Sequence, residues 1–331
     1  MKYYRLWVLS LFLKVVGSSW DASYHFKYFF EEYSIPHLVN FSGFALGGVL
    51  LIKEYKKTTY LTHSARIWIT IGYILFIIGI PLDFTYHLLR GIDLTTWSPT
   101  HFVYYIATGI MIYGVWVGYY HFDSKNPSWK SLHTFWAFFM VEALIFPCMQ
   151  QENGAISLFE YLHHQSIASK EILDLIKDPK SQIFGGVPDW VYPVYSSSVL
   201  ILFSIILWNL FNDMKIMVTA TAGYILYRYI AKAIFYLVIY PTSFVPIMAL
   251  VIPIILLISR RKSVFSCMIA GLGYFFILYL IQVSGIAITP PITWSMYILV
   301  LPANVISFYI AKYFVNFYKK GLARFKKEAI V

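Results

Sequence analysis

Residues 66–82 read RIWITIGYILFIIGIPL, a run in which Arg66 is the only charged residue. A helix rises 1.5 Å per residue, so about 17 to 25 apolar residues cross the roughly 30 Å of hydrocarbon in a bilayer. This run therefore predicts a membrane-spanning helix. The next residues, 83–101, read DFTYHLLRGIDLTTWSPTH and place two Asp, two His and one Arg at the end of that helix.

The rest of the chain has the same apolar character. Its 331 residues are 59% hydrophobic and 13% charged, and the mean hydropathy is +0.64, which is far more apolar than a soluble domain requires. We therefore expect an all-α, polytopic transmembrane helix bundle of about ten spans. The expected spans are about 3–19, 37–52, 66–82, 100–121, 132–149, 191–211, 214–237, 243–259, 264–282 and 292–316.

The basic residues predict the orientation of this bundle, because Lys and Arg are retained on the cytoplasmic side of a membrane. They gather in alternate connections: 2–5, 53–66, 125–130, 215, 260–262 and 319–327. We expect both termini to be cytoplasmic in a multi-pass protein of the cell membrane. The net charge of +10 is then explained by topology and by a basic tail that faces anionic lipid, so no nucleic-acid partner is expected.

Three parts are expected along the chain. Residues 1–149 form an N-terminal five-helix half, 150–190 an extracytoplasmic loop with an amphipathic helix, and 191–331 a C-terminal five-helix half with the basic tail. Lys14 within the first apolar run favours a retained span over a cleaved signal peptide. Two cysteines are too few for a disulfide framework and are interpreted as core thiols.

An internal repeat connects the polar residues at the helix ends. Residues 20–48 and 82–110 both contain Asp-x-x-x-His, a polar stretch with Ser and Pro, another His and then a new apolar helix. The first copy contains Asp21, His25 and His37, and the second contains Asp83, His87 and His101.

The spacing in each copy favours chelation of a metal ion. Asp and His four residues apart lie on one helix face about one turn apart. Ser followed by Pro is typical of a helix start, which puts His37 and His101 in or near the first turn of the next span. A third cluster is expected in the outer loop, where Glu160 precedes His163 and His164.

Imidazole and carboxylate together suit zinc, Cu(II) or non-haem iron better than magnesium or calcium. An oxidising compartment outside the membrane favours copper. The alternative is that these residues hydrogen-bond freed backbone groups and anchor helix ends at the membrane interface. The chain lacks a phosphate-binding Gly-x-x-x-x-Gly-Lys loop, a Gly-x-Ser-x-Gly elbow, His-Glu-x-x-His and Cys-x-x-Cys-His.

The stretch from Asp83 to about 105 resembles the metal-binding hairpin in the C subunit of the copper membrane monooxygenases, the particulate methane and ammonia monooxygenases. The resemblance covers about thirty residues. It implies that Asp83, His87 and His101 are copper ligands, in a setting that includes the nearby polar and helix-starting residues Asp93, Thr95, Ser98 and Pro99.

The sequence therefore predicts an integral membrane metalloprotein with an extracytoplasmic His/Asp site. Its expected role is that of an oxidoreductase or a monooxygenase-like subunit that relies on an electron donor or on partner subunits. The alternatives are a transporter or metal-handling permease, and a non-catalytic subunit of a membrane redox complex. Glu142 is expected to contact Arg228 or Lys232, because unpaired charges within spans are costly.

Overall fold

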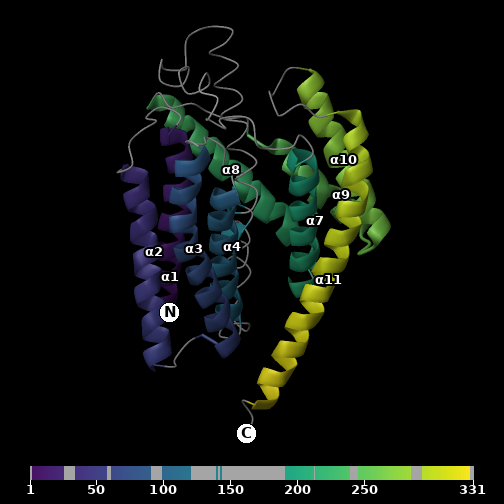
Figure 1. The fold of residues 1–331 in the computed structure, drawn as a ribbon. Helices are drawn as coiled ribbons and strands as arrows, with labels where there is room; N and C mark the ends of the chain where they lie inside the picture. Colours follow the sequence, from purple (N-terminus) through teal and green to yellow (C-terminus); the bar gives the residue numbers. More distant parts are fainter. Residues whose placement is uncertain are drawn as a thin grey trace. The chain divides into compact units, whose positions relative to one another are not determined.

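The computed structural model describes residues 2–25, 34–57, 61–90, 99–120, 139–140, 142–143, 191–211, 213–238, 245–284 and 293–328 (Figure 1). Within these residues every regular element is a helix. The expected all-α class is therefore confirmed for the described part of the chain.

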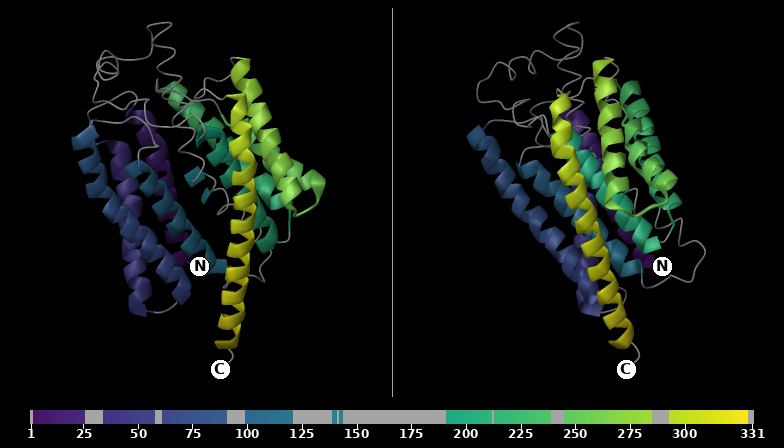
Figure 2. Two further views of the ribbon diagram at one scale, coloured as in Figure 1. Left: turned by 45° about the vertical axis from the view of Figure 1, so that its right-hand side comes forward. Right: turned by 90° about the vertical axis from the view of Figure 1, so that its right-hand side faces the viewer.

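The chain divides into two compact units, Met1–Val187 with Leu226–Val245 and Pro188–Ile225 with Pro246–Val331. The first contains α1 (Lys2–His25), α2 (Ile35–Lys57), α3 (His63–Arg90), α4 (Pro99–Tyr120) and the second half of α8 (Lys215–Leu237) (Figures 1 and 2). The second contains α7 (Val191–Phe211), the first half of α8, η1 (Ile247–Leu250), α9 (Val251–Ser259), α10 (Val264–Val283), η2 (Trp294–Met296) and α11 (Tyr297–Glu328). Residues 144–190 lie outside the described part, so the expected three-part organisation stays a prediction.

Four of the described helices are long and apolar enough to cross a membrane. They span Ile35–Lys56, His63–Leu89, Val264–Val283 and Trp294–Asn316. On α3, a stripe of exposed isoleucines at positions 67, 71, 74 and 78 recurs every three or four residues. A continuous apolar face of this kind is suited to contact with lipid. The remaining spans of the expected ten stay a prediction.

Small residues allow α3 and α4 to pack closely as an antiparallel hairpin. A Cβ added at Gly72 would lie 2.8 Å from the carbonyl oxygen of Ala107, and one added at Gly114 would lie 2.9 Å from the backbone nitrogen of Ile69. Between membrane helices, such contacts supply much of the association energy, since lipid tails are as apolar as the side chains. The closeness of the two backbones fixes which residues face each other at the end of the hairpin.

The α1–α2 hairpin is also closely packed, and polar side chains join its two helices. Ser10 Oγ donates to the carbonyl oxygen of Gly43 at 2.7 Å, and Asn40 Nδ2 donates to Ser18 Oγ at 2.8 Å. A Cβ at Gly17 would lie 2.5 Å from the backbone nitrogen of Asn40. Hydrogen bonds between helices satisfy polar groups that hydrocarbon cannot solvate.

In the second unit, a buried amide joins α7, α10 and α11. Ser197 Oγ donates to Asn304 Oδ1 at 3.2 Å, and the Asn304 side chain fills the space that the missing Cβ of Gly271 leaves open. Beside it, Tyr274 OH donates to Ser196 Oγ at 2.9 Å. Polar contacts therefore connect the helices of this unit as well.

The close packing of α3 and α4 predicts that Gly72→Ala is destabilising. The new methyl would press on the Ala107 carbonyl and the Met111 backbone, and such overpacking typically costs about 1 to 3 kcal/mol. Gly223→Ala in α8 is the matched control, because an added Cβ there meets nothing within 4 Å and alanine favours helix formation by up to about 1 kcal/mol. Thermal unfolding in detergent measures both. A Gly72→Ala protein as stable as Gly223→Ala would contradict the packing described above.

Candidate metal centre

The end of α3 presents an acid and an imidazole on one face. Asp83 and His87 lie one turn apart near the end of this helix, and their Asp-x-x-x-His spacing is uninterrupted. Pro81 lies inside the helix, and its carbonyl oxygen accepts a hydrogen bond of 2.7 Å from Thr85 Oγ1. Because α3 continues to Arg90, the proline does not end the helix before the two candidate ligands.

The start of α4 supplies the third candidate ligand. This helix begins at Pro99, which suits the first helical position because proline lacks an N–H and has a helical φ. His101 therefore lies in the first turn, and the predicted position of this histidine is confirmed. His37 likewise lies in the first turn of α2, where the backbone nitrogen of His37 donates to Ser34 Oγ at 3.2 Å.

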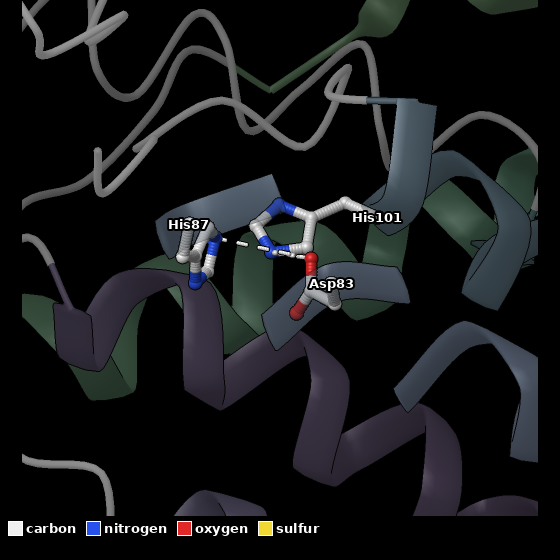
Figure 3. Close-up of side chains that lie close together, drawn as sticks. All are labelled: Asp83, His87 and His101. Atoms are coloured by element: carbon white, nitrogen blue, oxygen red, sulfur yellow. Dashed lines mark ion pairs between the residues drawn. The ribbon is translucent and has the colours of Figure 1, made fainter. Parts of the chain in front are cut away.

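Asp83, His87 and His101 point toward one another (Figure 3). Oδ1 of Asp83 lies 3.4 Å from Nε2 of His101 and 3.8 Å from Nε2 of His87. The two imidazole rings have centroids 5.6 Å apart and planes at 82°. The three side chains are 18%, 31% and 25% exposed respectively, so the cluster is partly covered, and Nε2 of His87 itself is buried.

These distances suit three ligands of one transition-metal ion. One ligand atom from each residue can be chosen so that all three lie within 4.8 Å of one another. Bonds of about 2.0 to 2.2 Å at a tetrahedral ion place neighbouring ligand atoms roughly 3.4 Å apart. The carboxylate and His101 already have that separation, and His87 lies 3.8 Å from the same carboxylate oxygen.

The Asp83 carboxylate is also held by a hydroxyl group. Thr100, the residue before His101, donates from Oγ1 to Asp83 Oδ1 at 2.6 Å. Sequence reasoning did not single out this residue. The contact joins α4 to α3 and depends on how these two helices pack, which the sequence alone does not give.

The first hairpin brings together Asp21 and His37, and their geometry is different. Nε2 of His37 lies 2.9 Å from Oδ1 and 3.1 Å from Oδ2 of Asp21, and Ser34 Oγ donates to Oδ1 at 3.3 Å. Acid and imidazole are here in direct hydrogen-bond contact. The side chain of His25, the third predicted ligand in this copy, lies outside the described residues.

Among the residues that the structure describes, the group of Asp83, His87 and His101 is the only set of three acidic, imidazole or thiol side chains close enough to share an ion. The predicted outer-loop ligands Glu160 and His164 lie outside the described ranges, so this part of the prediction stays untested.

The predicted contact of Glu142 with a basic residue of the seventh expected span is confirmed, and the partner is Arg228. Its Nε donates to Glu142 Oε2 at 3.1 Å and its Nη2 donates to Oε1. Both side chains are at least 95% buried. Ser19 Oγ adds a third donor to Oε1 at 2.8 Å, a contact that sequence reasoning did not predict. The negative charge of the buried Glu142 carboxylate is thus compensated by a guanidinium group and a hydroxyl group.

Lys14 is another buried polar side chain, and it is 0% exposed. Its Nζ lies 3.5 Å from the ring centroid of Phe76 and 5.4 Å from that of Phe44, and it donates to Asn40 Oδ1 at 3.2 Å. Aromatic faces and an amide oxygen are suited to an ammonium group. Lys14 therefore joins α1 to α2 and α3.

No known protein-family model matches this chain, and neither the curated proteins nor the solved structures contain a significant match. The functional argument therefore depends on the residues and their geometry.

The Glu142–Arg228 pair generates a prediction about stability. Glu142→Gln leaves the Arg228 guanidinium buried without its counter-charge, and breaking such a pair typically costs about 3 to 5 kcal/mol. The double variant Glu142→Leu with Arg228→Met removes both charges and is expected to recover most of this loss.

Lys232→Met, one turn beyond Arg228 on α8, is the matched control and should change stability little. Denaturation of the purified variants in detergent provides the measurement. Equal stability of Glu142→Gln and Lys232→Met would show that the ion pair does not form.

Proposed function

We propose that this chain is an integral membrane metalloprotein whose metal centre consists of Asp83, His87 and His101. The observation that carries the proposal is the approach of one carboxylate and two imidazoles from two helices to within 4.8 Å. The packing of α3 against α4 brings the three side chains together.

The spacing of acid and imidazole differs between the two hairpins, and the wider spacing in the second leaves room for an ion. His37 and Asp21 are in contact at 2.9 Å, which is an ordinary hydrogen-bond distance. The corresponding distances from Asp83 to His101 and His87, 3.4 and 3.8 Å, are longer than the usual limit of about 3.2 Å. Both distances lie within ion-pair range, and both also suit ligands around one metal ion.

Three protein ligands also favour a reactive centre over a purely structural one. Structural zinc sites are usually closed by four protein ligands, whereas catalytic sites keep a position for water or substrate. With two imidazoles and one carboxylate as ligands, an ion would keep at least one coordination position for water or substrate. The partial exposure of all three side chains agrees with access by a small molecule.

Copper is the metal that we propose, with zinc and iron as the alternatives. Mixed imidazole and carboxylate ligation supports cycling of copper between its two oxidation states, and the hairpin resembles that of the copper membrane monooxygenases. An oxidoreductase role would require an electron donor or partner subunit. The residues of this chain would hold the ion, fix its coordination geometry and restrict access to it.

We also propose the finer topology, with about ten spans, both termini in the cytoplasm and the metal centre at the outer rim of the cell membrane. The alternating basic connections and the four long apolar helices support it. A reporter phosphatase that is active only outside the cytoplasm should be inactive when fused after Val331. An active fusion there would contradict the orientation.

Metal analysis tests the proposed centre. Protein purified in detergent and loaded with copper should retain about one ion per chain, and His87→Ala or His101→Ala should remove it, because each takes away one of three ligands. His63→Ala is the matched control, since this residue begins the same helix at its opposite end and should leave the metal content unchanged.

The other outcomes have definite meanings. Zinc or iron at the same stoichiometry, lost in the same variants, would keep the centre and correct the metal. Wild-type protein that retains no copper, zinc or iron after loading would overturn the proposal. Substrate uptake by proteoliposomes of such metal-free protein would then favour the permease.

A further inference from the structure

Thr100 makes the shortest contact to the Asp83 carboxylate among those described. Its Oγ1 donates to Oδ1 at 2.6 Å, within the range of charge-assisted O–H···O⁻ hydrogen bonds, and the residue is 7% exposed. Oδ1 is also the oxygen that faces Nε2 of both His87 and His101. The hydroxyl group and the two imidazoles therefore all lie close to the same carboxylate oxygen.

Thr100 lies at the start of α4, and its hydroxyl donates to a residue of another helix. Within a helix, a threonine hydroxyl often bonds the carbonyl oxygen three or four residues earlier, as Thr85 does with Pro81. Thr100 is the second residue of α4, so no earlier turn of this helix offers such an acceptor. Its hydroxyl is instead directed across to α3.

The first hairpin contains a comparable contact from a different position. Pro36 precedes His37 and has no hydroxyl, yet Ser34 Oγ donates to Oδ1 of Asp21. Among the described contacts, each hairpin thus has a hydroxyl group near the start of its second helix that donates to the aspartate of its first helix.

We propose that Thr100 is a positioning residue for the metal centre, one that fixes the rotation of the Asp83 carboxylate so that Oδ1 faces the ion. This inference rests on the proposed function. Without the hydroxyl, the Asp83 carboxylate can rotate about its Cβ–Cγ bond, and Oδ1 is then no longer held toward the ion. Hydrogen-bond partners of metal ligands typically change metal affinity by about 10- to 100-fold when they are removed.

The test is titration of the purified full-length protein with Cu(II) against a competing chelator. Thr100→Val keeps the shape of the side chain and removes the hydroxyl, so it should weaken Cu(II) binding by about 10- to 100-fold. Thr100→Ser restores the hydroxyl and should bind nearly as tightly as the wild type. Thr108→Val, on the same helix and equally buried, is the matched control and should bind like the wild type.

Two further measurements separate positioning from a general structural effect. The copper hyperfine splitting in the electron paramagnetic resonance spectrum should differ between Thr100→Val and wild type and return to the wild-type value in Thr100→Ser. Thermal unfolding of the metal-free proteins shows whether each variant is folded, and Thr100→Ala replaces Thr100→Val if that protein does not fold.

Wild-type affinity and an unchanged spectrum in Thr100→Val would overturn the role of Thr100 while leaving the metal centre in place. Absence of Cu(II) binding in the wild type would overturn the proposed copper centre itself, and the role of Thr100 with it.

Discussion

The close approach of the α3 and α4 backbones is the constraint on which the candidate site depends. α3 is long and apolar enough to cross a membrane, and hydrocarbon gives no hydrophobic driving force between helices, so dense packing is the means by which such a helix holds its neighbour. Glycines at 72 and 114 allow this approach, because any side chain there would meet the backbone of the facing helix. The resulting register sets Asp83 opposite the first turn of α4. The chemistry at the helix ends therefore follows from packing in the middle of the hairpin.

The two hairpins use similar residues to reach different arrangements. In the first, Asp21 and His37 form a direct contact. Ser34 Oγ donates to Asp21 and accepts from the backbone nitrogen of His37 at the start of α2. In the second, the acid and imidazoles are further apart and converge on a common point. The different spacing of these acids and imidazoles is why the proposed metal centre is assigned to the second hairpin.

Local patterns in the sequence predicted much of this arrangement. Apolar runs predicted the helices, Asp-x-x-x-His predicted a shared helix face, and Ser with Pro predicted the helix starts that carry His37 and His101. The Glu142 contact could be anticipated because a charge within a span requires a partner. The partners Ser19 and Thr100, and the aromatic surroundings of Lys14, could not be predicted, since each depends on the register between helices. The register between two helices depends on how they pack against each other, and the residue pattern along one helix does not predict it.

The nitrogen and oxygen environment of a bound copper ion tests the central claim most directly. X-ray absorption and electron spin-echo measurements on copper-loaded protein should show two imidazole nitrogens and a carboxylate oxygen at about 2.0 to 2.2 Å. A first shell with thiolate sulfur at about 2.3 Å, or one without imidazole, would contradict the account, because the ion would then bind away from the α3–α4 hairpin.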